Sequence, residues 1–354
     1  KEKEKLMRKT IADNMFEADD SDISGQKGDY DTNTGLFRTD DKVVSRKGKY
    51  EINTSKRNKY QLSRLEVLFD VWFKDVEKVI IKSQYCRKCG FALYTPRPSN
   101  IDMEAKYHYL INNAFDYKIE YSDNKKPKIT SLDSLRSNII FKKCLPYFKK
   151  KKLEVLDYGG GSGSNLINFI KNGSNCFLVD FDKNNLNGAI NIGSDINQID
   201  CNQKFDLIIC SHVLEHISDL KTIINKLKFH LKEKGIIYAE VPLEIKAGIS
   251  LEYDPVTHIN FFTKNSLKNL FLSNGFNILA NKDEILPYSY SFLHASWIIV
   301  QNTKKESFPL LKSDIIKNLY PSRFKLLNIY LKICLKKFFM KKNLFLKLLL
   351  NNIF

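Results

Sequence analysis

The sequence predicts an α/β fold with a doubly wound, mainly parallel sheet. From residue 153 onward, short apolar runs alternate with segments in which apolar residues recur every three or four positions. A glycine-rich stretch, residues 159–163, joins the first apolar run directly to the first of these helical segments. Such alternation is typical of parallel strands whose connecting helices cover both faces of one sheet.

The limits of the elements follow from the apolar runs and from the glycines and prolines that end them. Gly173, Gly235 and Gly275 each follow a helical segment, and Pro242 ends a strand. The predicted strands are 153–157, 176–180, 205–210, 235–241, 276–280 and 296–301. The predicted helices are 132–149, 164–171, 220–231 and 264–273. No strand is assigned between Asp180 and Phe205, where the pattern is not clear.

Composition divides the chain into four parts. Residues 1–45 are polar, with nine acids and two bases in residues 11–41, and predict a mobile acidic arm. Residues 46–131 mix short apolar runs with a Cys-x-x-Cys turn and predict a small accessory module. Residues 132–302 form the α/β domain, and residues 303–354 predict a basic amphipathic helical tail.

The net charge of +17 does not predict nucleic-acid binding. Only 9 of the 57 basic residues are arginine, the residue that nucleic-acid surfaces recruit for bidentate hydrogen bonds. Residues 312–354 carry ten bases and one acid, so more than half of the excess lies on the tail. The seven cysteines, together with an N-terminal stretch unlike a signal peptide, predict a cytoplasmic protein without disulfides. No apolar run reaches the roughly 18 residues that span a bilayer.

The glycine-rich loop is the strongest functional motif. It follows a buried strand, at the edge of the sheet where open parallel sheets bind their ligands. Glycine permits a sharp turn and lets a ligand contact the main chain. A dinucleotide-binding fingerprint would need a third glycine where Ser164 stands, and a Walker phosphate loop would need a Gly-Lys pair that the loop lacks.

This loop and three later segments resemble class I S-adenosylmethionine-dependent methyltransferases. The run Asp-x-Gly-x-Gly-x-Gly from Asp157 resembles motif I of that family. Residues 205–217 (FDLIICSHVLEHI) resemble its fourth strand, and residues 240–242 the end of its fifth. Residues 258–263 (HINFFT) resemble a subgroup found in bacterial sugar and surface-polysaccharide biosynthesis. The resemblance implies a Rossmann-like methyltransferase fold with seven strands, and S-adenosyl-L-methionine as cofactor.

The same resemblance implies how the cofactor is held. The loop packs against its methionine part, Asp157 organises the loop, and Asp180 accepts hydrogen bonds from the ribose hydroxyls, with Asp182 as the nearby alternative. Asp195 and Asp200 remain alternatives for the acid beside the adenine. The residues assigned to the cofactor are Asp157, Tyr158, Gly159, Gly160, Gly161, Gly163, Asp180, Phe181, Ser211 and His212.

Two histidines are candidates for acid/base catalysis. His258 follows the fifth strand, where acceptor-binding loops usually lie, and His212 follows the fourth. A neutral imidazole suits the removal of a hydroxyl proton near neutral pH, although each ring has the alternative of a packing role. In the sugar C-methyltransferases that this segment resembles, a Tyr and a Glu precede the histidine. Here residues 255–257 are Pro, Val and Thr, which favours O-methylation. His216 is interpreted as structural.

No metal site is predicted. Cys86 and Cys89 form half of a zinc knuckle, but residues 1–85 contain no further cysteine or histidine to complete it. The tail carries Lys325, Lys332, Lys336 and Lys347 on one helical stripe among apolar residues. This pattern predicts packing on the domain or on a second copy of the chain, with contact to an anionic membrane surface as the alternative.

The predicted function is O-methylation of a sugar or glycan precursor. A small-molecule methyltransferase of the quinone or lipid type is one alternative, because residues 205–217 resemble those enzymes as well. A catalytically silent binding module is another. An oxidoreductase is disfavoured by Asp157 and by the missing third glycine.

Overall fold

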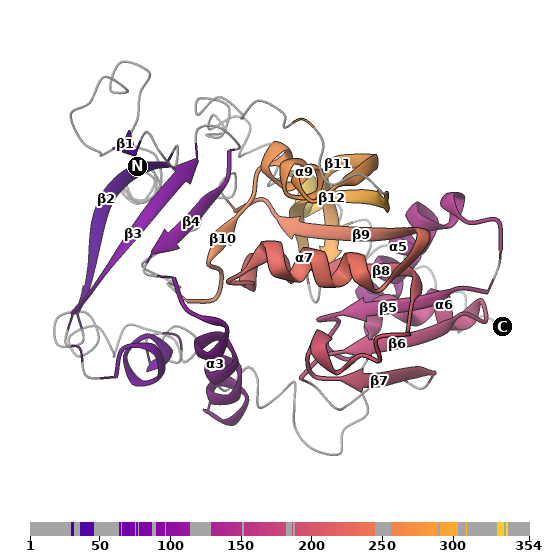
Figure 1. Cartoon of the computed structure of the whole chain (residues 1–354), viewed down its shortest axis with the longest axis horizontal. Coiled ribbons are helices and arrows are strands. Elements are labelled where there is room, and N and C mark those ends of the chain that lie inside the picture. Colours follow the sequence, from indigo (N-terminus) through magenta and orange to yellow (C-terminus); the bar gives the residue numbers. More distant parts are fainter. Residues whose placement is uncertain are drawn as a thin grey trace.

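The structure of the chain is a computed structural model (Figure 1). The described residues are 30–31, 36–45, 64, 66–74, 76, 78–86, 90–95, 97–113, 129–150, 152–181, 186, 188–244, 256–288, 291–303, 309, 331–335 and 338. Most of the predicted tail, part of the Cys-x-x-Cys turn and Asp182 lie outside these residues.

The larger sheet has seven strands in the spatial order β11-β12-β9-β8-β5-β6-β7. The five strands from β9 to β7 in this order are parallel, and β12 is antiparallel to both β9 and β11. The strands are β5 (Glu154–Tyr158), β6 (Asn175–Val179), β7 (Ala189–Gly193), β8 (Phe205–Ser211), β9 (Leu231–Pro242), β11 (Phe276–Tyr288) and β12 (Ser291–Asn302). The predicted Rossmann-like methyltransferase fold, with a mainly parallel seven-stranded sheet, is confirmed.

Helices cover both faces of this sheet, and each face has its own apolar core. One face is covered by α7 (Leu220–Phe229) and α9 (Lys264–Ser273), and the other by α5 (Ser131–Cys144) and α6 (Ile167–Lys171). All of β8 is buried, with Ile208 in the first core and Ile209 in the second. Double burial explains why this strand is a continuous apolar run instead of an alternating one.

Besides β9 and β12, which begin earlier than predicted, at Leu231 and Ser291, three elements differ from the sequence prediction for local physical reasons. The strand β7 lies in the segment that was left unassigned, because its side chains are mostly half-buried at the sheet edge and its apolar pattern is weak. The helix predicted over 132–149 ends at Cys144, just before Pro146, which lacks the N–H that continues a helix. The strand predicted over 276–280 extends to Tyr288, since charged residues on its exposed face hide the continuation.

A second sheet, antiparallel and five-stranded, lies beside the first (Figure 1). Its order is β1-β2-β3-β4-β10. The strands are β1 (Tyr30–Asp31), β2 (Leu36–Ser45), β3 (Lys78–Cys86), β4 (Ala92–Thr95) and β10 (Asn260–Phe261). The helix α3 (Asn100–Asn113) follows β4, and Trp72 Nε1 donates to its Asp102 carbonyl at 2.8 Å.

Residues 36–45 correct the predicted extent of the mobile arm. They form β2 and pair antiparallel with β3, with Val43 opposite Ile80. The pairing gives backbone partners to one edge of β3, and the β-branched pair at Val43 and Val44 suits a strand. Residues 1–29 lie outside the described residues, so the rest of the arm stays a prediction.

The two sheets are joined by Arg97 and Asn260. Asn260 lies in β10, which pairs with β4 although it comes from the α/β part of the chain. Its Nδ2 donates to the carbonyls of Leu214 and Ile217, each at 2.7 Å. Arg97 donates to Asn260 Oδ1 at 2.7 Å and to the Ser218 carbonyl at 2.8 Å. The accessory sheet therefore holds the turn that follows β8.

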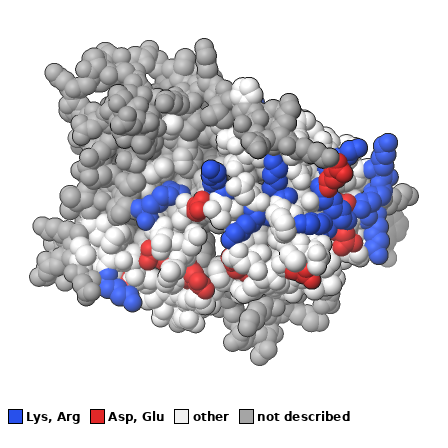
Figure 2. All heavy atoms as spheres, viewed as in Figure 1, with Lys and Arg blue, Asp and Glu red and all other residues white. Residues whose placement is uncertain are grey.

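The described surface carries charges of both signs. On the face shown in Figure 2, Lys and Arg side chains lie next to Asp and Glu side chains instead of forming an area of one sign. Among the residues that the structure describes, no helix combines the length and the apolar character needed to cross a membrane. On the described part of the tail, Leu331, Leu335 and Phe338 are exposed.

We expect Asn260→Ala to lower the free energy of unfolding by about 1–3 kcal/mol, because buried carbonyls and the Arg97 guanidinium would lose a partner. The measurement is urea unfolding of the full chain. Asn172→Ala is the matched control, since the side chain of Asn172 donates to Asn168 at an exposed site. The free energy of unfolding of Asn172→Ala should stay within about 0.5 kcal/mol of the wild-type value. Equal losses for the two variants would contradict the role of Asn260.

Candidate functional site

The candidate site lies at the carboxyl ends of β5, β6, β8 and β9. In a parallel sheet these ends meet at one edge, where the following loops can surround a ligand. Tyr158 ends β5, Val179 ends β6 and Ser211 ends β8. The glycine loop, Asp180 and the turn holding His212 therefore come together from three separate parts of the sequence.

The glycine loop is tied to the neighbouring strand. Gly159 N–H donates to the Val179 carbonyl at 2.8 Å, and Gly161 N–H donates to Asp180 Oδ2 at 2.8 Å. Gly159, Gly161 and Gly163 have φ values of 67°, 56° and 81°, a region that residues with a Cβ rarely adopt. Asp180, the residue that follows β6, thus organises the loop.

The space around the loop glycines fits a ligand that contacts main chain. A Cβ on Gly160 would lie 2.1 Å from Asp157 Oδ2, and one on Gly159 would lie 2.6 Å from a Val213 methyl. A Cβ on Gly161 would meet no atom of the described residues within 4 Å. The loop is therefore packed tightly against the protein on one side and open on the other, as the predicted cofactor requires.

Asp157 lies beneath this loop and is fully buried. Its carboxylate accepts from Asn165 Nδ2 at 3.2 Å. Burial raises the pKa of Asp157 to about 7, although the hydrogen bond from Asn165 opposes the rise. The carboxylate therefore lies directly beneath Gly160 of the loop.

The adenosine side of the predicted site receives a side chain from the accessory module. Phe181, which follows Asp180, stacks on Tyr107 of α3 with ring centroids 5.6 Å apart. Asp195 is half-buried, and its charge raises the pKa of Tyr158, although burial is the larger cause. Asp200 is exposed and caps a turn. Of the two acids considered for adenine, Asp195 lies on the side of the loop.

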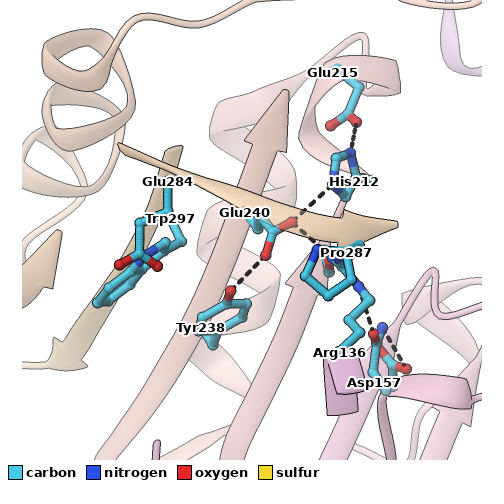
Figure 3. Close-up of polar contacts among 11 residues, drawn as sticks. Arg136, Asp157, His212, Glu215, Tyr238, Glu240, Glu284, Pro287 and Trp297 are labelled. Atoms are coloured by element: carbon cyan, nitrogen blue, oxygen red, sulfur yellow. Dashed lines mark hydrogen bonds and ion pairs between the residues drawn. The ribbon is translucent and has the colours of Figure 1, made fainter. Parts of the chain in front are cut away.

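A buried chain of charges connects α5 to the turn after β8 (Figure 3). Glu240 Oε1 accepts from Arg136 Nη2 and from His212 Nε2, each at 2.9 Å, while Tyr238 donates to Glu240 Oε2 at 2.6 Å. Arg136 also donates to Asn165 Oδ1 at 3.1 Å and to the Ser211 hydroxyl. Since Asn165 contacts Asp157, the chain reaches the glycine loop.

The electrostatics of this chain follow from its opposite charges. Burial alone would raise the pKa of Glu240, but Arg136 and then His212 outweigh it and lower the pKa to about 2. Arg136 is 5% exposed and Glu240 1% exposed, so water screens the pair very little. Glu240 is therefore an anion that neutralises two buried cations.

His212 does not fit the predicted role of a base. Its side chain is 5% exposed, with Nδ1 3.3 Å from Glu215 Oε1 and Nε2 bonded to Glu240. Burial lowers the pKa of His212, but the hydrogen bonds and charges of Glu215 and Glu240 outweigh it and raise the pKa above its ordinary value, which favours the cation and makes the ring a poor proton acceptor. Its φ of 56° is also strained, at a cost of roughly 1–3 kcal/mol.

Two other residues assigned to the cofactor are turned into the protein. The Tyr158 ring lies in the first apolar core, so any contact with the cofactor would use its main chain. The Ser211 hydroxyl accepts from Arg136 and is buried. Their positions at strand ends agree with the prediction, while their side chains serve packing and the charge chain.

The predicted base, His258, belongs to a cluster on the acceptor side. Its Nδ1 lies 2.6 Å from Glu244 Oε1, and its ring centroid is 4.7 Å from that of His216. Burial, together with the nearby His258 and Lys106, holds the pKa of His216 well below its ordinary value, so His216 is neutral. Tyr107 of α3 lies edge-on to His216 at 6.4 Å.

Sequence reasoning missed Arg136, Glu244 and the α3 residues Lys106 and Tyr107. A signal existed for Arg136, because it lies on the same helical stripe as the buried Leu132. An arginine on the apolar face of a helix needs a buried counter-charge. No comparable signal existed for α3, since its contacts with the site depend on how the accessory module packs.

The comparison with protein families concerns this part of the chain. Residues 133–281 match a family model described as a methyltransferase domain. The segment contains the glycine loop, Asp180, Glu240 and His258.

The chain is also similar to ubiquinone biosynthesis O-methyltransferases. It is 26% identical over 117 residues to that of Rickettsia bellii, which covers 30% of this chain and 49% of the relative. It is 30% identical over 109 residues to that of Rickettsia typhi, which covers 28% and 44%. The chain thus spans about half the length of the curated relatives it matches.

One solved structure with similarity is a 1,6-didemethyltoxoflavin-N1-methyltransferase from Burkholderia thailandensis with bound S-adenosylhomocysteine. It is 15% identical with a TM-score of 0.44, over 60% of this chain and 96% of that one. Another is a magnesium protoporphyrin IX methyltransferase from Synechocystis, 16% identical with a TM-score of 0.38, over 55% and 97%.

We expect Glu240→Gln to lower the free energy of unfolding by about 3–5 kcal/mol at pH 7, because two buried cations would lose their counter-charge. Glu233→Gln, on the exposed part of the same strand, is the control and should change it by no more than about 0.5 kcal/mol. Both are measured by urea unfolding.

The pH dependence of the free energy of unfolding tests whether the ionised carboxylate of Glu240 is the cause of this loss. Since the folded pKa of Glu240 is about 2, below its ordinary 4.5, its contribution is complete above pH 4.5 and is lost as pH falls towards 2. The difference between wild type and Glu240→Gln should therefore shrink over that range. A difference that is constant with pH would argue against an ionised Glu240.

Proposed function

We propose that the S-adenosylmethionine-dependent methyltransferase domain of this chain methylates a hydroxyl oxygen of a small molecule, with a sugar or glycan precursor as the first candidate. The observation that carries this proposal is the position of two imidazoles, His216 and His258, on the same edge of the sheet as the open glycine loop. The glycine loop would bind the methyl donor, and the imidazoles would act on the methyl acceptor.

The cofactor would be held by residues already described. Gly159 to Gly163 would face its methionine part, Asp180 its ribose, and Phe181 with Asp195 its adenine. When bound, S-adenosylmethionine supplies an electrophilic methyl group that moves in line from sulfur to oxygen, while the acceptor hydroxyl loses its proton. The protein has to align the two partners and promote the loss of that proton.

His258 is the residue that we assign to proton loss. Its Nδ1 donates to the Glu244 carboxylate, which orients the ring and leaves the lone pair of the neutral form on Nε2. His212 is excluded from this role by its two carboxylate partners. Phe261 and Phe262 follow His258 and are buried, so they support the segment that carries it.

A second candidate is methylation of a phenolic hydroxyl on a quinone-type molecule. The similarity to ubiquinone biosynthesis O-methyltransferases favours it. Both candidates use the same oxygen chemistry, and they differ in the apolar area of the acceptor. Turnover of a glycosyl panel against a catechol panel distinguishes them, and turnover of neither would favour a catalytically silent binding module.

We expect Asp180→Ala to weaken binding of S-adenosylhomocysteine by about 1.5–3 kcal/mol, or roughly 10- to 150-fold, because a charged acceptor is lost. Isothermal titration calorimetry measures the effect. Asp70→Ala, on an exposed site of the accessory module, is the control and should bind like wild type. Binding of a nicotinamide dinucleotide by the wild type, with none of S-adenosylhomocysteine, would refute the proposal.

We expect His258→Ala to lower turnover by roughly 10²–10⁴, since that is the usual contribution of a positioned group acting on a proton. Affinity for S-adenosylhomocysteine should stay nearly unchanged. His230→Ala is the control, because His230 bonds to the Gln203 carbonyl at the opposite edge of the sheet. That variant should lose stability but keep its turnover per folded molecule. The same pattern in His258→Ala would reduce His258 to a packing residue.

A further inference from the structure

Three side chains beside the proposed acceptor position form a set of metal ligands. They are Glu215, His216 and His258, and one ligand atom from each lies within 4.8 Å of the others. Two ligands of a tetrahedral ion at 2.0–2.2 Å lie about 3.3–3.6 Å apart. The ligand atoms would therefore have to approach one another by up to about 1.5 Å, through side-chain rotation, to bind one ion. The prediction of no metal site was argued from the cysteines. The sequence does not show that these three residues lie close together in the folded chain.

The Glu215 carboxylate is the part of the cluster that most needs a partner. The residue is 1% exposed, and neither Oε1 nor Oε2 receives a hydrogen bond from the residues that the structure describes. Its contact with His212 is an ion pair at 3.3 Å. His212 therefore compensates part of the carboxylate's charge at Oε1, and a metal ion would satisfy Oε2, which no described residue does.

The hydrogen bonds of the two histidines leave Nε2 as the ring nitrogen that carries the lone pair. His216 Nδ1 lies 2.6 Å from the Thr257 carbonyl, which can only accept, so Nδ1 carries the proton and Nε2 has the lone pair. His258 Nδ1 has the same relation to Glu244 Oε1 at 2.6 Å. A histidine whose second nitrogen donates to a carboxylate or carbonyl is the usual arrangement of a metal ligand.

Hydrogen bonds hold the turn that carries Glu215 and His216 close to the segment that carries His258. Glu215 and His216 lie in the short 3₁₀ turn Leu214–His216 after β8, and the Ile259 N–H donates to the Glu215 carbonyl at 3.0 Å. The side chain of Asn260 holds the same turn through Leu214 and Ile217. The residues on either side of His258 are thus bound to the turn that carries the other two ligands.

We propose that Glu215, His216 and His258 bind one divalent transition-metal ion of the class of Zn²⁺ or Co²⁺. Two imidazoles and one carboxylate suit such ions better than Mg²⁺ or Ca²⁺, which prefer oxygen ligands. Three protein ligands leave a position open for an acceptor oxygen, as in catalytic zinc sites. In its catalytic consequence this inference rests on the proposed function: the ion would lower the pKa of the acceptor hydroxyl so that its proton passes to water, and His258 would then promote proton loss as a ligand of the ion instead of taking the proton itself.

The test is titration of the chelator-treated full chain with Co²⁺, followed by calorimetry and by visible absorption, with Zn²⁺ as competitor. We expect one Co²⁺ per chain. Glu215→Gln should weaken binding by at least about 100-fold, and Glu244→Gln, which changes only the group that orients His258, by about 10- to 100-fold. Two controls should bind like wild type: His108→Ala on the surface of α3, and the double variant Cys86→Ser with Cys89→Ser.

Each variant is also titrated with S-adenosylhomocysteine, which reports a folded cofactor site. If S-adenosylhomocysteine binds but wild type takes up no more Co²⁺ than Glu215→Gln, the metal site is refuted while the methyltransferase proposal stands. Loss of Co²⁺ binding in the cysteine variant alone would refute the assignment to this cluster. Stoichiometric Co²⁺ binding without any binding of S-adenosylhomocysteine would support the metal site and refute the cofactor proposal.

Discussion

The buried carboxylate of Glu240 is the interaction on which the arrangement of the site depends. It lies near the end of β9 and is shared by Arg136 from α5 and His212 from the turn after β8. A buried anion between two buried cations is stable only when all three are held in place, because each would be costly alone. The charge chain therefore fixes a helix on one face of the sheet relative to the loops at its edge.

Through Asn165, the same chain reaches the glycine loop. Asn165 accepts from Arg136 and donates to Asp157, and Asp157 fills the space beneath Gly160. The loop is in turn tied to Asp180 by the Gly161 amide. A ligand bound on the open side of the loop thus meets main chain that is supported from below, which reduces the entropy lost on binding.

The accessory module takes part in the site instead of standing apart from it. Its Arg97 binds the turn after β8 together with Asn260, and its Lys106 donates to the Val256 carbonyl beside the segment of His258. Its Tyr107 lies between Phe181 on the cofactor side and His216 on the acceptor side. Differences in this module would therefore change which acceptors fit, without changes in the larger sheet.

The sequence by itself determined six strands of the larger sheet and the glycine loop, because the patterns that mark them are local. The run 205–210 is apolar since both faces of β8 are buried, and the glycines from Gly159 mark positive φ values within one turn. The sequence did not determine the roles of Arg136, His212 and Glu215. The sequence pattern predicts that His212 is a base. In the folded chain its ring contacts the carboxylates of Glu215 and Glu240, and Glu240 lies 28 residues later in the sequence. Only the tertiary structure decides such roles, since a titratable group takes its charge from neighbours that the chain brings together by folding.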